Sequence, residues 1–330
     1  MSILSDFLTD GRIPIGPLAK ALFDWLKNFK PAFKAFGDAT KAAIEGLTDI
    51  LQSLPLDILV LAVAVLALAI LGRMREMAIA MAVGLLAIFA LRLGGVALPE
   101  LPKAVAPYIL IALFVALTWV IQRRWQPCAI VALGFLFIMN QGYWKETTET
   151  LALVAFVCGI CMVIGVPVGV AAAHRPRLFQ TMQPVLDLMQ TLPAPVYLIP
   201  FVILFGIGLV PALFASIIFV VPASIRLTHL GVSSTPMALK EAATAFGSTD
   251  RQLLWKVELP WAFPQIMAGL NQTIMLSLSM VVISAWVGAA GLGVPVVKAL
   301  NQVRPDLGFE SGSVIVALAI LLDRMLRVSK

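Results

Sequence analysis

Hydrophobic residues in this chain are gathered into long runs that are separated by short polar segments. A helix needs about 20 apolar residues to cross roughly 30 Å of hydrocarbon, and several runs approach that length. The runs lack the polar–apolar alternation of a barrel strand, so they predict membrane-spanning helices. We predict nine spans, with eight as the alternative count, at residues 56–72, 77–93, 106–122, 127–141, 148–172, 185–207, 211–228, 261–285 and 312–328.

One polar segment, Lys240–Trp261, lies between two of the most apolar parts of the chain. Before it, Thr235–Pro236 reads as a helix start with a capping side chain and a proline in the first turn. Gly247 should end this helix. Residues 248–250 are all capping residues and predict a second short helix, which Pro260 should end.

Composition places the chain in the membrane and argues against an enzyme. Hydrophobic residues make up 60% and charged residues 13%, whereas soluble domains have about 25% charged residues, and the mean hydropathy is +0.96. The sequence contains no HExxH, GxSxG or GxxxxGK[ST] motif, so we expect no catalysis, ATP hydrolysis or metal site in this chain. Cys158 and Cys161 form a CxxC inside an apolar run and are interpreted as packing residues.

Lys and Arg are unevenly distributed between the spans, which predicts the orientation of the chain. The richer side holds residues 227–260 and the C-terminus, so both are expected in the cytoplasm and the N-terminus outside. Residues 1–53 form an extracytoplasmic tail with the 3.6-residue periodicity of an amphipathic helix that Pro31 ends. That helix is expected either on the membrane surface or against the protein's own helices. Its apolar stripe consists of Leu18, Leu22, Trp25, Leu26 and Phe29.

Residues of the polar segment also match a known motif at fixed spacing. The match comprises Glu241, Ala242, Ala243, Gly247, Val257, Leu259 and Pro260. It resembles the EAA loop of ABC importer permeases, with valine where isoleucine is commoner. The resemblance implies that this loop inserts a helix into a groove on a separate ATPase subunit. It also implies that Mg-ATP binds that partner and that this chain holds no cofactor.

Three further stretches, 186–200, 204–208 and 268–283, resemble the glycine betaine/proline betaine ABC importer permeases. The resemblance implies an all-α integral membrane protein with a five-helix type I ABC importer core within residues 106–330. It further implies a homodimer, two ATPase subunits, an extracytoplasmic binding protein and a bacterial cytoplasmic (inner) membrane, with no nucleic acid as partner. The accessory transmembrane hairpin predicted at 54–105 departs from the family pattern and leaves the exact substrate open.

The implied function is import of a betaine- or choline-like methylated amine from a binding protein into the cytoplasm. One alternative is an ABC permease for another small polar solute, such as an amino acid. Another is a secondary carrier, which would need an intramembrane acid pair or inverted repeats that we do not find in the sequence. A channel, or a scaffold without transport, would not need an EAA loop.

A candidate substrate path lies on the span 261–285, on which Asn271 also lies. Thr273, Ser277, Met280 and Ser284 recur at i, i+4, i+7 and i+11, so one helix face is small, weakly polar and free of carboxylates. Such a face would let a zwitterion or a methylated cation slide without holding it. Close helix packing is the alternative interpretation of the same residues.

Overall fold

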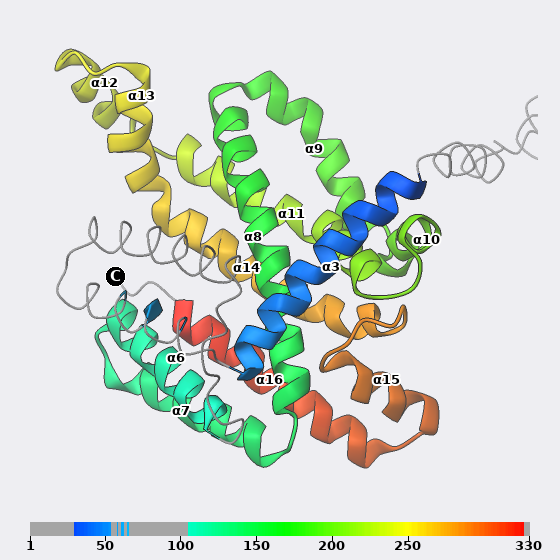
Figure 1. The fold of residues 1–330 in the computed structure, drawn as a ribbon. Coiled ribbons are helices and arrows are strands. Elements are labelled where there is room, and N and C mark those ends of the chain that lie inside the picture. The colour runs from blue at the N-terminus through cyan, green and yellow to red at the C-terminus, as the bar shows by residue number, and fades with distance from the viewer. Residues whose placement is uncertain (1–29, 54–57, 59–60, 63–64, 66–104, 327–330) are drawn as a thin grey trace, which may run out of the picture.

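The computed structural model describes residues 30–53, 58, 61–62, 65 and 105–326. Within these residues every regular element is a helix, and the helices form one bundle (Figure 1). Most of the predicted span 56–72 and all of the predicted span 77–93, and hence most of the predicted hairpin, lie outside the described residues. The tail helix predicted around Leu18 to Phe29 also lies outside them.

Three long helices form the centre of the bundle: α8 (Trp144–His174), α11 (Leu209–Ser233) and α14 (Leu259–Ala285). Helix α11 packs extensively against both α8 and α14. The approach of α8 to α11 is close enough that a Cβ atom at Gly165 would collide with the hydroxyl of Ser224. Small residues at such contacts allow helix backbones to approach closely in membranes.

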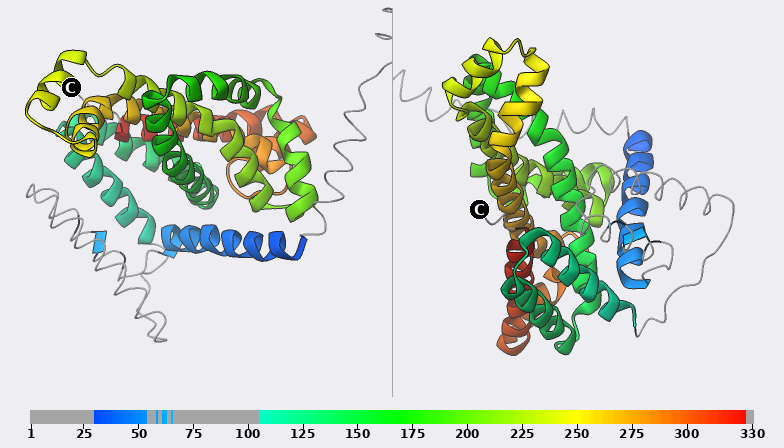
Figure 2. Two further views of the ribbon diagram at one scale, coloured as in Figure 1. Left: turned by 90° about the horizontal axis from the view of Figure 1, so that it is seen from above. Right: turned by 90° about the vertical axis from the view of Figure 1, so that its left-hand side faces the viewer.

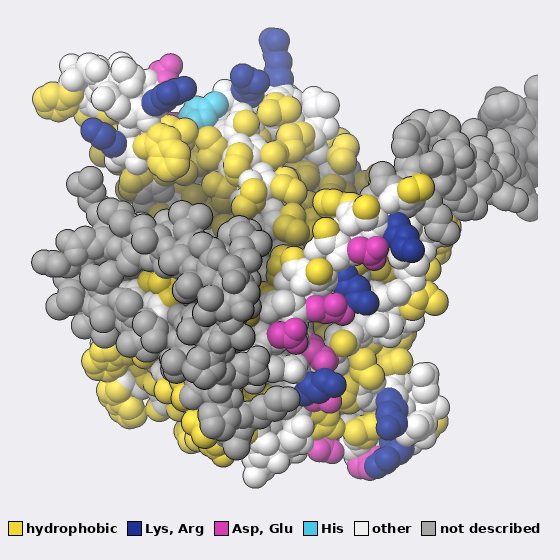
Figure 3. Space-filling view, in the orientation of Figure 1, with side chains coloured by type: hydrophobic (Ala, Val, Ile, Leu, Met, Phe, Trp, Pro, Cys, Tyr) yellow, Lys and Arg dark blue, Asp and Glu magenta, His cyan; other side chains and the backbone are white. Residues whose placement is uncertain are grey.

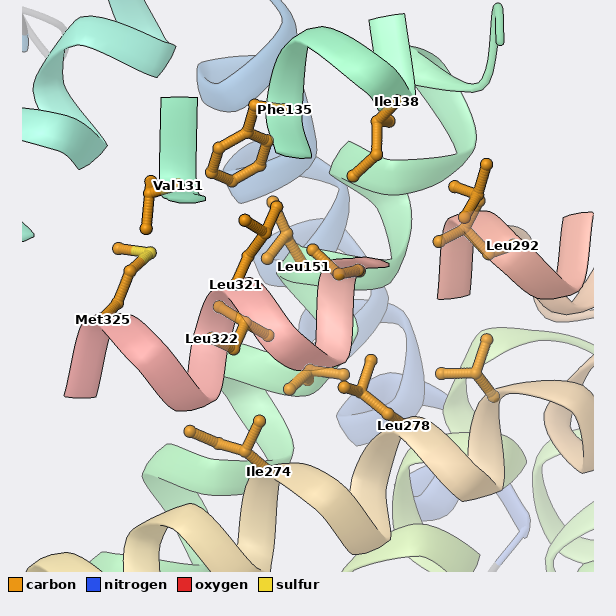
Figure 4. Close-up of a cluster of buried hydrophobic side chains, with 14 of the residues drawn as sticks. Val131, Phe135, Ile138, Leu151, Ile274, Leu278, Leu292, Leu321, Leu322 and Met325 are labelled. Atoms are coloured by element: carbon orange, nitrogen blue, oxygen red, sulfur yellow. The ribbon is translucent and has the colours of Figure 1, made fainter. Parts of the chain in front are cut away.

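A second group of helices packs on one side of this centre: α6 (Ala106–Gln122), α7 (Trp125–Asn140) and α16 (Pro305–Leu326). The rings of Phe114 and Phe135 stack at 5.1 Å between α6 and α7. A buried hydrophobic cluster joins these helices to α8 and α14 (Figure 4). Its labelled members are Val131, Phe135, Ile138, Leu151, Ile274, Leu278, Leu292, Leu321, Leu322 and Met325.

Helix α3 (Lys30–Ser53) belongs to the predicted tail and packs on α8, α10, α11 and α6. The amide of Gln52 donates to the Thr148 hydroxyl of α8 at 3.0 Å, and Ile44 is fully buried. Pro31, expected to end a preceding helix, lies in the first turn of α3, where a missing amide donor costs nothing. The outer face of α3 carries both signs of charge (Figure 3), from Lys34, Asp38, Lys41, Glu45 and Asp49.

The segment 185–207, predicted as one helical span, is not one continuous helix. The chain forms two helices there, α9 (Pro176–Thr191) and α10 (Ala194–Phe205), with a bend of 91° between them. Leu192 adopts an extended conformation, with ψ of 134°, because the residue before a proline is disfavoured in the helical region. Apolar composition continued across the bend, so hydrophobicity alone did not reveal it.

The other six predicted spans in the described region coincide with α6, α7, α8, α11, α14 and α16. Four helices there are long and apolar enough to cross a membrane, or five if α9 and α10 count as one broken span. Helices α6 and α7 are apolar but shorter, at 17 and 16 residues. A further helix, α15 (Gly293–Gln302), was not predicted.

The bundle has two ends of different character. Helices α12 (Met237–Ala245) and α13 (Asp250–Leu253) project from one end, and α15 lies at the other (Figures 1 and 2). Basic and hydrophobic side chains lie together around the α12–α13 end (Figure 3). This projection is the polar segment that the sequence singles out.

Candidate coupling site

Helix α12 ends in a turn that depends on Gly247. The amide of Gly247 donates to the Thr244 carbonyl at 2.9 Å and that of Ser248 to the Ala243 carbonyl at 3.1 Å. This pair of bonds is the Schellman arrangement, in which the residue after the C-cap adopts a left-handed backbone. Gly247 has φ of +77°, a left-handed backbone, and it ends α12 as predicted. Glycine is the residue that adopts this conformation without steric cost.

The second helix begins at the predicted cap. The amide of Gln252 donates to the Thr249 hydroxyl, and the Thr249 amide donates to the Gln252 side chain, at 3.4 and 3.0 Å. This capping box satisfies two amides that a helix start leaves free. The predicted cap for α12 is wrong in detail, because Pro236 takes the capping position without a side-chain bond. The Thr235 side chain is buried instead.

Pro260 does not end the second helix, contrary to the prediction. Helix α13 continues through a π-helical turn, η2 (Leu254–Glu258), into α14, so the chain stays helical from Asp250 to Ala285. Pro260 lies in the first turn of α14, directly after this wider turn. A π turn accommodates the missing amide and the ring of a proline that would break a regular helix. Helix α13 of the projection and the membrane helix α14 are therefore one continuous helix.

The motif residues divide into an exposed set and a set that supports it. Glu241 and Ala242 of α12 are exposed, and Glu241 has no hydrogen bond or ion pair within the described part of the chain. Val257 and Leu259 are half-buried at the base of the projection. Large apolar side chains that the motif does not include are also exposed here: Met237, Leu239, Phe246 and Trp255. Sequence reasoning missed these side chains, although their apolar character in a polar loop was a usable signal.

A buried carboxylate, also missed from the sequence, fixes α12 to the bundle. Glu258 is 2% exposed, and its Oε1 atom lies 2.9 Å from Nζ of Lys240 on α12. Its other oxygen lies 2.7 Å from Nε2 of His174, the last residue of α8. The residues are far apart in sequence, so only the fold shows their proximity.

A second polar contact joins α9 to α11. Arg226 of α11 donates to Asp187 at 2.6 Å and to Gln190 at 3.2 Å. The Arg226 and Asp187 side chains are 35% and 54% exposed, and ion pairs this exposed contribute little to stability. The contact therefore orients α9 more than it stabilises the fold.

The predicted path residues are buried within this single chain. Thr273, Ser277, Met280 and Ser284 are at most 3% exposed, and the Ser277 hydroxyl lies 3.9 Å from the Cys158 sulfur of α8. The Thr273 and Ser277 hydroxyls donate to carbonyls of their own helix. Asn271 and Ser284 each have a buried side-chain oxygen without a hydrogen-bond partner among the described residues. The stripe thus faces neighbouring helices, and its role as a path stays a prediction.

Comparison with known proteins places the chain among transport proteins. Residues 165–328 match the family described as "Binding-protein-dependent transport system inner membrane component". The glycine betaine transport system permease protein OpuAB of Bacillus subtilis is 48% identical over 217 residues, which cover 66% of this chain and 77% of that relative. The glycine betaine/carnitine transport permease protein GbuB of Listeria monocytogenes is 46% identical over 224 residues, covering 67% and 79%.

A solved structure gives the same fold. The MetNI methionine ABC transporter, in an inward-facing conformation, matches with 26% identity and a TM-score of 0.50. The match covers 55% of this chain and 94% of that chain.

The fold and these relatives define a type I ABC importer permease, a multi-pass membrane protein that translocates solute and is not an enzyme. The chain belongs to the family of binding-protein-dependent transport system inner membrane components. Members of this family act with an ATPase and a substrate-binding protein. The projection formed by α12 and α13, together with its base in η2 and the start of α14, contains the motif that resembles the EAA loop.

Gly247→Val should weaken co-purification of the chain with its ATPase. A β-branched residue in the left-handed conformation costs about 1–2 kcal/mol, and the strained turn would change the angle between α12 and α13. No atom lies within 4 Å of a Cβ at this position, so the effect would arise from the backbone alone. Gly247→Asn is the matched control, because asparagine tolerates this conformation. Equal recovery of the ATPase with both variants would contradict the assignment.

Proposed function

We propose that the chain is the permease subunit of an ATP-driven importer for glycine betaine or a related methylated amine. The observation that carries this is the 48% and 46% identity to permeases named for glycine betaine. A trimethylamine N-oxide permease of Pelagibacter ubique, 38% identical, and a choline permease of Bacillus subtilis, 29% identical, extend the range to other methylated amines. All of these solutes share a small, weakly hydrated methylated head.

An importer for an amino acid, whose amino nitrogen carries no methyl group, is the second candidate. The solved methionine transporter, which has the same fold and is 26% identical to this chain, supports that candidate. The higher identity to the betaine permeases favours the methylated amines. The two candidates differ only in the solute delivered by the binding protein.

In this proposal two ATPase subunits bind Mg-ATP and receive the exposed face of α12, whose Glu241 contacts or orients the ATPase. The apolar side chains beside Glu241 support such a joint, because buried aromatic and aliphatic anchors dominate protein interfaces. Phe246 is 93% exposed and Trp255 is 70% exposed. Burial of these apolar side chains in a groove would remove apolar surface from water, which is favourable in free energy. The projection then lies in the cytoplasm of a bacterium, and the long apolar helices span its inner membrane.

A second copy of the chain completes the transporter in this proposal. Gln272 and Ser279 are exposed on α14, on a face turned away from α8 and α11. A carboxamide facing hydrocarbon leaves its polar groups unsatisfied, so a polar residue in a membrane helix belongs against protein or water. A partner permease packed against this face would supply that environment.

The substrate path is proposed along the stripe of Thr273, Ser277, Met280 and Ser284, with Asn271 beside it. The unpartnered oxygens of Asn271 and Ser284 support this, since buried polar atoms normally find a partner. A polar solute or water would satisfy them when α8 and α14 separate. The path is thus closed in the present conformation.

The variant Ser277→Cys tests the path through its contact with the native Cys158. Oxidation should form a disulfide that holds α14 against α8, since the two side chains are already within 3.9 Å. If the helices must separate for passage, oxidation blocks uptake while ATP hydrolysis continues, and reduction restores uptake. In the matched control, Ser277→Cys is combined with Cys158→Ala, so no disulfide can form between the two helices and oxidation should leave uptake unchanged. Unchanged uptake with a complete disulfide assigns the stripe to packing.

The transport function itself is tested with the purified complex reconstituted into vesicles. Radiolabelled glycine betaine and the binding protein are added to the medium outside the vesicles. We expect accumulation that requires ATP on the ATPase side and falls when unlabelled choline or carnitine competes. Native mass spectrometry of the same complex should give a mass that corresponds to two copies of this chain. Methionine uptake without betaine uptake would favour the amino-acid importer, and uptake driven by an ion gradient without ATP would contradict both.

A further inference from the structure

The contact of Glu258 with Lys240 and His174 is unlike the other ion pairs in the described residues, because its carboxylate is almost completely buried. The Glu258 side chain is 2% exposed, against 54% for Asp187 and 63% for Asp306 in their pairs. Both carboxylate oxygens are engaged, at 2.9 and 2.7 Å. An ionised carboxylate removed from water in this way depends on its partners for compensation.

The three residues come from three separate structural elements. Lys240 lies in α12, Glu258 ends the π-helical turn, and His174 ends α8. The other ring nitrogen of His174 lies 3.0 Å from the carbonyl of Val170 in α8. That carbonyl can only accept, so Nδ1 donates to it, and Nε2 faces Glu258 from a ring fixed to the helix end. The carboxylate therefore bridges the projection to the membrane helix α8.

We propose that Glu258 is a positioning residue through which movement of α12 on the ATPase is passed to α8. This inference rests on the proposed function. The continuous rod from α13 to α14 already carries such a movement into α14. Glu258 adds a second route, because Lys240 and His174 cannot move apart without leaving a buried charge unpaired. Movement of the projection then reaches both helices that border the proposed path, α14 through the backbone and α8 through Glu258.

The test compares transport stoichiometry, measured as substrate molecules imported per ATP hydrolysed, in the reconstituted complex. Glu258→Gln keeps the side-chain shape and removes the charge. We expect assembly and ATP hydrolysis to persist while the ratio falls at least about fivefold, a typical lower value for coupling between sites. The matched control is Lys256→Met, which removes an exposed charge two residues away in the same turn and should keep the wild-type ratio.

A double-variant cycle separates positioning from general stabilisation. If Glu258 acts through Lys240, the double variant Lys240→Met with Glu258→Met loses no more coupling than Lys240→Met alone. The reason is that the double variant leaves no buried carboxylate without its partner. Losses that multiply would show independent roles and overturn the proposal. A Glu258→Gln variant that keeps the wild-type ratio would also overturn the proposal. A Glu258→Gln variant in which assembly and uptake fall in proportion would overturn it as well.

A distance measurement tests the same inference without any substrate. Spin labels at Ala171 on α8 and Ala245 on α12, both exposed positions, report the spacing of the two elements in the assembled complex. The wild type should give a narrow distance distribution and Glu258→Gln a broad one. An unchanged distribution overturns the positioning role. If the wild-type complex shows no ATP-driven uptake, the proposed function fails while this comparison still decides the role of Glu258.

Discussion

The close contact between α8 and α11 is the interaction around which the other helices are arranged. The Ser224 hydroxyl of α11 donates to the Cys161 carbonyl of α8 at 2.9 Å, next to the glycine that admits it. Between membrane helices there is little hydrophobic driving force, so such small-residue contacts and hydrogen bonds hold helices together. Helix α11 then serves as the shared surface for α14, α9, α10 and α3. The bundle is therefore organised from its centre outward.

Rigid connections lead from this centre to the projection at the end of the molecule. Helix α14 continues through the π-helical turn into α13 without a break, and the Glu258 carboxylate ties α12 back to α8. The Schellman turn at Gly247 sets the angle between the two short helices. A force applied to α12 thus reaches two central helices through backbone and through a buried ion contact. This arrangement suits a subunit whose energy source lies on a separate protein.

Much of this arrangement followed from the sequence because its signals are local. Apolar runs predicted six helices, and the helix end at Gly247 and the cap within residues 248–250 were predicted from the residue types at those positions. Errors arose where neighbouring structure overrides a local rule. Proline was expected to end a helix at Pro260, but the π turn before it accommodates the ring, whereas the proline after Leu192 broke a span that looked continuous. The Glu258 contact needed three elements brought together by folding.

The central claim is that the α12–α13 projection is the joint with the ATPase, and site-specific photo-crosslinking tests it most directly. A photoreactive phenylalanine analogue would replace Phe246 in one experiment and Val303, which is 85% exposed near α15 at the other end, in a second. We expect a covalent adduct with the ATPase subunit in membranes from position 246 and none from position 303. An ATPase adduct from position 303, or none from position 246 in an assembled complex, would contradict it.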